Sequence, residues 1–118
     1  MTDLDVLDRL VQAITVDAYD VAEQMTAFRS VFTEAVTGPT KATIVGVPVL
    51  VLEVDIRYTG TELTAHCRHG DYQQEISLTD LVFAPETAAA WIHAAYRRCL
   101  ALEPLPAAIP VGWQPSWL

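Results

Sequence analysis

The chain has 118 residues, 52% of them hydrophobic, and a formal net charge of −8. This length suits one domain with a single core, and the apolar content excludes a disordered chain. No apolar run approaches the ~20 residues of a membrane-spanning helix, and the excess of acid opposes binding to nucleic acid or anionic lipid.

The first residues are acidic and lack the basic segment that opens a secretory signal, so we expect a cytoplasmic protein. Thr2 or Asp3 can cap a first helix. The apolar residues that follow fall on one helical stripe, formed by Leu4, Leu7, Leu10, Val11 and Ile14. β-branched Thr15 and Val16 weaken this helix, so we expect a short extended link after it.

Three carboxylates, Asp17, Asp20 and Glu23, lie where a second helix is expected to begin. Asp20 and Glu23 have the spacing of an N-cap and its reciprocal partner, so one interpretation is that the acids only stabilise a helix N-terminus. The other interpretation is a hard-cation site, because Ca²⁺ is bound by carboxylates, carbonyls and water. Its metal ligands would be Asp17, Asp20 and Glu23.

The second helix is predicted by one apolar face, which contains Val21, Met25, Phe28, Phe32, Ala35 and Val36. Gly38-Pro39 ends it, so residues 1–37 are expected to form a helical hairpin. The aromatic stripe is typical of a core, and a ligand groove is the alternative.

Residues 41–83 change to a period of two, which predicts four or five short antiparallel strands. Leu50, Leu52, Val54 and Ile56 are expected on the buried face of the longest strand, with Val51 on its wet face. We expect the strands to close into a small SH3-like or Tudor-like β-barrel, which removes most exposed edges.

Residues 85–102 predict a closing helix that begins at Pro85-Glu86 and carries Trp91 on its apolar stripe. Residues 103–118 are too rich in proline for a helix or a central strand. This tail either docks Trp113 and Trp117 on the body or is an exposed ligand for another chain. The predicted fold is therefore α+β, in one domain of residues 1–118.

Motifs of the common enzyme classes are absent, so we expect no enzyme. His66-Cys67-Arg68-His69 has metal-ligand types, but alternate strand residues point apart and no second Cys/His pair accompanies them. Glu53 and Asp55 share one strand face, which suits a solvated face or acid/base chemistry. His93 is expected to be at the surface or partly packed, and the two cysteines to be reduced thiols.

The stretch Val16-Asp17-Ala18-Tyr19-Asp20, followed by Glu23-Gln24, resembles the N-terminal motif of the CcbP-type cytosolic calcium-binding proteins. A helix with aromatics, a small β-rich segment and a Trp-containing helix follow in the order of that family. The loop at residues 57–62 departs from the family, which is richer in acid there. The resemblance implies a cytosolic protein with Ca²⁺ as its ligand.

Two leading functions follow. The first is a CcbP-like protein that binds Ca²⁺ weakly at the acidic motif. The second is a protein-interaction module without a metal, in which the barrel rim or the tail binds a protein partner or a second copy of the chain. A small enzyme that uses carboxylates in a cleft is the third and weakest alternative.

Overall fold

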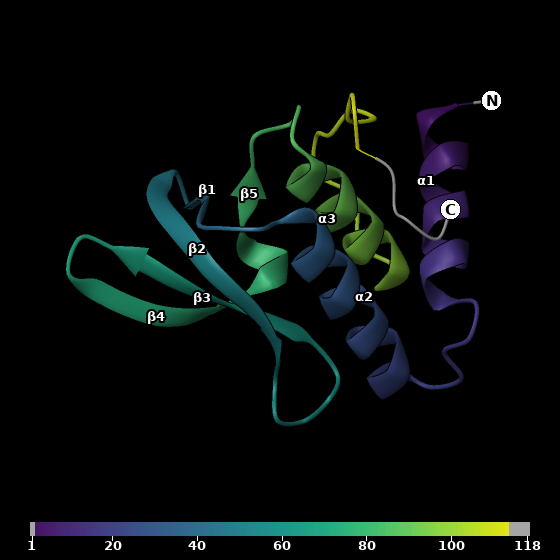
Figure 1. Cartoon of the computed structure of the whole chain (residues 1–118), viewed down its shortest axis with the longest axis horizontal. Helices are drawn as coiled ribbons and strands as arrows, with labels where there is room; N and C mark the ends of the chain where they lie inside the picture. Colours follow the sequence, from purple (N-terminus) through teal and green to yellow (C-terminus); the bar gives the residue numbers. More distant parts are fainter. Residues whose placement is uncertain (1, 114–118) are drawn as a thin grey trace.

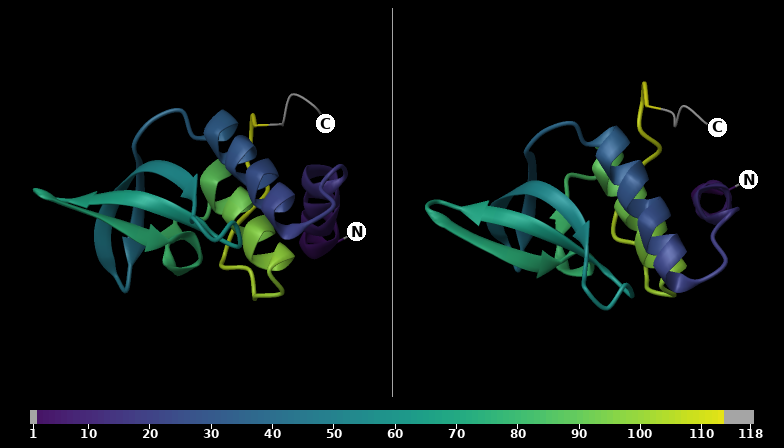
Figure 2. Two further views of the ribbon diagram at one scale, coloured as in Figure 1. Left: turned by 90° about the horizontal axis from the view of Figure 1, so that it is seen from below. Right: turned by 60° about the horizontal axis from the view of Figure 1, so that its bottom comes forward.

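A computed structural model describes residues 2–113 and shows the expected α+β fold. Three layers are visible in Figure 1: an antiparallel sheet, a central pair of helices, and an outer helix. The helices are α1 (Asp3–Thr15), α2 (Val21–Ala35) and α3 (Ala88–Cys99). Helices α2 and α3 form the central layer, and the two views of Figure 2 place α1 on the far side of them from the sheet.

The sheet has five strands in the order β4-β3-β2-β1-β5 and is not closed into a barrel. Its strands are β1 (Thr40–Ile44), β2 (Val47–Ile56), β3 (Leu63–His69), β4 (Tyr72–Ser77) and β5 (Val82–Phe83), with a 3-10 turn η1 at Leu78–Asp80. The expected SH3-like or Tudor-like barrel is therefore wrong for residues 2–113. The sheet buries one face under α2 and α3, so its core forms without closure, and β4 and β5 remain edge strands.

A β-bulge in β2 explains why the expected faces of this strand were partly wrong. The pairing of β2 with β3 shifts between Val51 and Glu53. An extra residue in one strand reverses the alternation of side chains beyond it. Val51 is consequently buried, although the simple alternation placed it on the wet face, and Leu50 is only half-buried. Val54, beyond the bulge, packs against the core as expected.

The aromatic stripe of α2 is part of the core, as the spacing predicted. Met25, Phe28 and Phe32 are buried. The ring of Phe28 meets the ring of Tyr96 on α3 edge to face, with centroids 5.6 Å apart. The Tyr96 hydroxyl accepts a hydrogen bond of 2.8 Å from the backbone N–H of Leu63. One pair of aromatic side chains therefore joins both central helices to the start of β3.

Helix α3 begins at Ala88, three residues later than the expected start at Pro85. Thr87 is its N-cap, and the Thr87 hydroxyl accepts a hydrogen bond of 3.2 Å from the N–H of Ala90. A capping hydroxyl satisfies an N–H that the first turn leaves free. The first turn of the helix is thus set by Thr87 and not by proline.

His93 is buried in α3, with 1% of its surface exposed, so the expected surface or partly packed position was wrong. Helix α3 lies between α1 and the sheet, which leaves few of its side chains in solvent. The Nε2–H of His93 donates to the carbonyl of Leu78 at 2.7 Å, and its ring meets Phe83 edge to face. Burial lowers the pKa of His93 to about 4.

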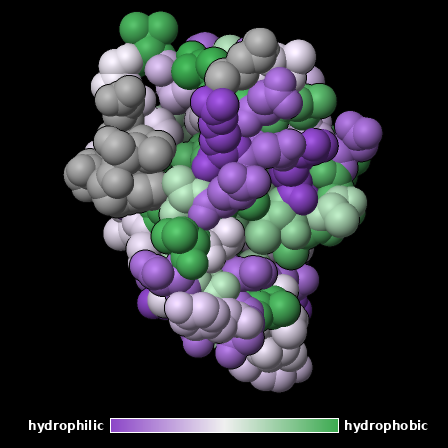
Figure 3. All heavy atoms as spheres, turned by 90° about the vertical axis from the view of Figure 1, so that its right-hand side faces the viewer, coloured by the Kyte–Doolittle hydropathy of each residue, from purple (hydrophilic) through white to green (hydrophobic). Residues whose placement is uncertain are grey.

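Helix α1 packs on the central helices through buried Leu7, Leu10 and Ile14. Thr2 caps it, accepting a hydrogen bond from the N–H of Asp5 at 3.2 Å. Figure 3 faces this side of the molecule and shows hydrophilic residues gathered in its upper half. An ion pair joins α1 to α3, in which Arg98 donates to both carboxylate oxygens of Asp8 at 2.6 and 3.1 Å.

The Pro-rich tail follows α3 without helix or strand as far as residue 113. The N–H of Ala108 donates to the carbonyl of Pro85 at 3.0 Å, and Trp113 is partly buried against the core. These contacts hold the described part of the tail on the body, whereas Trp117 lies outside the described residues. None of the helices in residues 2–113 has the length and apolar character needed to cross a membrane.

Candidate functional site

The acidic motif lies in a tight turn between α1 and α2, not in the extended link expected from Thr15 and Val16. Thr15 remains helical, and Val16 keeps helical backbone angles of φ −55° and ψ −37°. The N–H of Ala18 then donates to the carbonyl of Thr15 at 3.0 Å. The turn brings Asp17 close to the start of α2 because it reverses the chain within a few residues.

Asp20 and Glu23 cap α2, with one difference from the expected reciprocal pair. Oδ1 of Asp20 accepts a hydrogen bond of 2.8 Å from the N–H of Glu23, which is the expected N-cap. Oε2 of Glu23 accepts from the N–H of Tyr19 at 3.1 Å, one residue before the cap itself. The helix N-terminus therefore accounts for one oxygen of each carboxylate.

A cavity of about 640 Å³ lies between the end of α1, the turn and the first half of α2. Asp17 and Glu23 line it, and Asp20 does not. Thr26 and Ser30 also line this cavity, and the hydroxyl of each donates its proton to a carbonyl one turn earlier in α2. Their oxygen lone pairs therefore remain free to accept or to bind a cation.

The three predicted ligands are thus only partly brought together. Within residues 2–113, no group of three or more His, Cys, Asp or Glu side chains has the proximity needed to hold a metal ion. Asp17 and Glu23 share the cavity, whereas Asp20 points its bound oxygen at the helix. The lining of this cavity is mostly apolar, and its four polar residues, Asp17, Glu23, Thr26 and Ser30, suit a hydrated hard cation and not a fully dehydrated one. The hydroxyls of Thr26 and Ser30 were missed because both residues lie off the apolar stripe, and only the docking of α1 turns them into a cavity wall.

We expect Asp20→Ala to lower the free energy of unfolding by ~1 kcal/mol, because the N–H of Glu23 loses its partner. Asp20→Ser should keep nearly the full stability, since serine caps almost as well as aspartate. Urea unfolding without calcium measures both variants. A serine variant as unstable as the alanine variant would contradict capping as the role of this side chain.

The other sequence candidates are held in separate contacts. Cys67 is buried, the Nε2 atom of His66 lies 2.7 Å from Oε1 of Gln73, and Nδ1 of His69 donates to the carbonyl of Pro48 at 2.8 Å. Asp55 forms an ion pair of 3.1 Å with Arg29. Hydrogen bonds from the N–H of Ile56 and from Arg29 hold the pKa of Asp55 below its usual value, which opposes a role as a general acid.

The comparison with known proteins rests on structure alone. No family model matches the chain, and no curated protein matches its sequence. The crystal structure of Anabaena CcbP superposes with a TM-score of 0.66 over 86% of this chain and 94% of that chain, at 16% identity. The chain has the fold of Anabaena CcbP. The resemblance to CcbP-type proteins is thus confirmed at the level of the fold, and at 16% identity this likeness to CcbP carries no statement about ligands.

Proposed function

We propose that this protein is a CcbP-like domain that binds Ca²⁺ weakly at the turn between α1 and α2. The observation that carries the proposal is the shared cavity of Asp17 and Glu23, in a chain with the fold of CcbP. The resemblance of Val16–Gln24 to the CcbP motif supports the same place.

The chemistry explains why binding would be weak. Ca²⁺ takes six to eight oxygen ligands, and tight sites supply most of them from the protein. Here the contributors are Asp17, the second oxygen of Glu23, and the hydroxyls of Thr26 and Ser30. Asp20 lies outside this lining and contributes only its negative charge. Water completes the coordination, so we expect a dissociation constant above about 1 μM.

Calorimetric titration of metal-stripped protein with Ca²⁺ tests this function. We expect a weak heat signal that the double substitution Asp17→Asn, Glu23→Gln abolishes. The matched control is Asp71→Asn, Glu86→Gln, which removes the same charge from two exposed residues outside the cavity and should keep the signal. Equal heats for wild type and the Asp17/Glu23 variant would remove these carboxylates from the proposal, and binding tighter than about 1 μM would contradict a sparse, hydrated site.

The second candidate function is a metal-free interaction module, and exposed apolar residues at one end of the sheet favour it. Val45, Val47 and Val82 are 94%, 44% and 42% exposed, and Val45 and Val47 lie at or beside the tip of the β1–β2 hairpin. Val45 has a φ of +48°, a left-handed conformation that β-branched residues rarely adopt. Two results together would favour this function over the first: calorimetry detects no Ca²⁺ binding, and the wild-type protein forms a dimer that the substitution Val45→Asn abolishes.

A further inference from the structure

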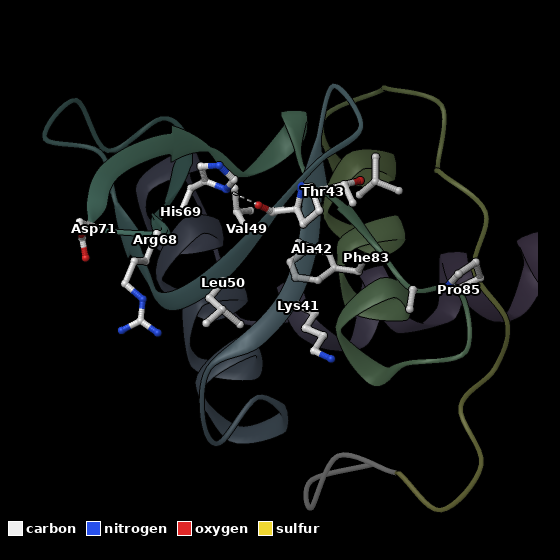
Figure 4. Close-up of a pocket in the computed structure, with 14 residues that line it drawn as sticks. Lys41, Ala42, Thr43, Val49, Leu50, Arg68, His69, Asp71, Phe83 and Pro85 are labelled. Carbon is white, nitrogen blue, oxygen red and sulfur yellow. Dashed lines mark hydrogen bonds between the residues drawn. The ribbon is translucent and has the colours of Figure 1, made fainter.

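A groove of about 970 Å³ opens on the sheet, remote from the turn that carries the acids. Figure 4 shows residues of β1, β2 and the β3–β4 hairpin lining it, together with the segment that follows β5. Its apolar lining includes Pro48, Leu50 and Val82, and its polar lining includes Lys41, Arg68 and His69. A volume of this size is within the range of small-molecule sites in proteins.

The register of the sheet places two cations on either side of an apolar side chain. Leu50 of β2 lies directly opposite Lys41 of β1 and directly opposite Arg68 of β3. Directly opposite residues of antiparallel strands point to the same face. Figure 4 shows the ammonium group of Lys41 and the guanidinium group of Arg68 extending to the same side, with Leu50 between them.

Neither cation is neutralised by the part of the chain that the structure describes. Three other arginines form ion pairs, Arg29 with Asp55, Arg57 with Glu62 and Arg98 with Asp8. Lys41 and Arg68 are exposed, and their side chains form no ion pair or hydrogen bond within residues 2–113. Asp71 also lines the groove, but it forms no ion pair with Arg68. Two free cations in a chain of net charge −8 make this groove locally favourable for an anion.

We propose that the groove binds a soluble amphipathic anion. Its acidic group, a carboxylate, sulfonate or phosphate, would lie between Lys41 and Arg68, where both side chains donate charge-assisted hydrogen bonds. Its apolar body would cover Leu50, Pro48 and Val82, which the register places on the same face of the sheet as Lys41 and Arg68. A polyanion such as nucleic acid is a poor fit, because two cations do not offset the repulsion from the remaining surface.

Titration with decanoate, followed by amide chemical shifts and by calorimetry, tests the proposal on the full chain. Three compounds serve as controls. Acetate carries the head group without the apolar body, decanol carries the apolar body without the charge, and decyltrimethylammonium carries a similar apolar body with the opposite charge. We expect decanoate to bind with shifts confined to β1, β2, the β3–β4 turn and residues 82–85, and the other three compounds to bind at least tenfold more weakly. Equal binding of decanol and decanoate would overturn the charge requirement.

Single-charge variants separate the groove from the overall charge of the protein. Lys41→Gln and Arg68→Gln should each weaken decanoate binding by roughly threefold to tenfold, as for the loss of one partly exposed ion pair. Arg9→Gln makes the same charge change at an exposed residue of α1, outside the groove, and should leave the affinity unchanged. An Arg9→Gln effect as large as that of Lys41→Gln would overturn the proposal. The wild-type shift map decides the location of binding if a variant folds poorly.

Anionic lipids of a membrane are the other source of amphipathic anions. A vesicle sedimentation assay distinguishes binding to a membrane surface from binding of a soluble ligand. Phosphatidylcholine vesicles with and without phosphatidylglycerol are sedimented with the protein in the presence and absence of decanoate. We expect no retention on either vesicle. Retention on the anionic vesicles that Lys41→Gln reduces and decanoate does not displace would overturn a soluble ligand in favour of a lipid surface.

Discussion

Replacing Phe28 by alanine should lower the free energy of unfolding by about 3–5 kcal/mol. The ring of Phe28 is fully buried and contacts Tyr96, which holds the start of β3. Its removal leaves a cavity at the point where α2, α3 and the sheet meet, and the two helices cannot collapse onto it without moving β3. Urea unfolding followed by circular dichroism measures the loss.

The matched control is Tyr58→Ala, which truncates an aromatic side chain that is 96% exposed. It should change the free energy of unfolding by no more than ~0.5 kcal/mol. A Phe28→Ala loss below ~1 kcal/mol, or a Tyr58→Ala loss of similar size, would contradict the assignment of Phe28 to the centre of the core.

Acid should destabilise the protein through His93 by about 3 kcal/mol. The unfolded chain binds a proton at this imidazole near pH 6.5, whereas the native protein does so only near pH 4, because burial opposes the charged ring. Between these two values the unfolded state binds more protons than the native state, so stability falls as the pH falls from 6.5 to 4. The contribution of neutral His93 to stability is fully present above pH 6.5 and is completely lost below pH 4.

The variant His93→Gln separates this contribution from that of the carboxylates. A glutamine amide can donate to the carbonyl of Leu78 as the Nε2–H of His93 does, but it does not titrate in this range. Urea unfolding at several pH values should give a shallower pH dependence for this variant than for the wild type. Parallel curves for wild type and His93→Gln would contradict the buried neutral histidine.

The helices and caps could be predicted because their signals are local. Thr2 and Asp20 act as N-caps as their positions indicate, and Phe28 and Phe32 are buried as their spacing indicates. A helix stripe and a capping residue depend on neighbours within one or two turns, so the sequence carries them directly.

The shape of the sheet could not be predicted in this way. Whether it closes depends on whether β4 and β5 meet, and their residues carry no local signal for pairing. The bulge beyond Val51 reverses the alternation of side chains along β2, because a single extra residue moves the side chains beyond it to the other face of the sheet. His93 was misplaced because its burial depends on α1 and β5 packing around α3, which spacing along α3 does not reveal.

The two candidate sites also differ in how far the sequence could predict them. Asp17 and Glu23 are close in sequence, so their convergence on one region could be predicted, although the different partner of Glu23 could not. Lys41 and Arg68 come from different strands and meet across Leu50 only through the register of the sheet. Nothing in the spacing of these two residues indicates a common groove.

Helix α1 forms an outer layer that rests on α2 and α3. This position should allow α1 to open locally before the rest of the native structure does. It is held by one apolar stripe and by the exposed ion pair of Asp8 with Arg98. Elements with one buried face open more often than the centre, and their amide protons exchange earlier. An ion that joins Asp17 to Glu23 would tie the end of α1 to the start of α2. Calcium occupancy would then slow amide exchange along α1 and leave the exchange of the β3 amides unchanged.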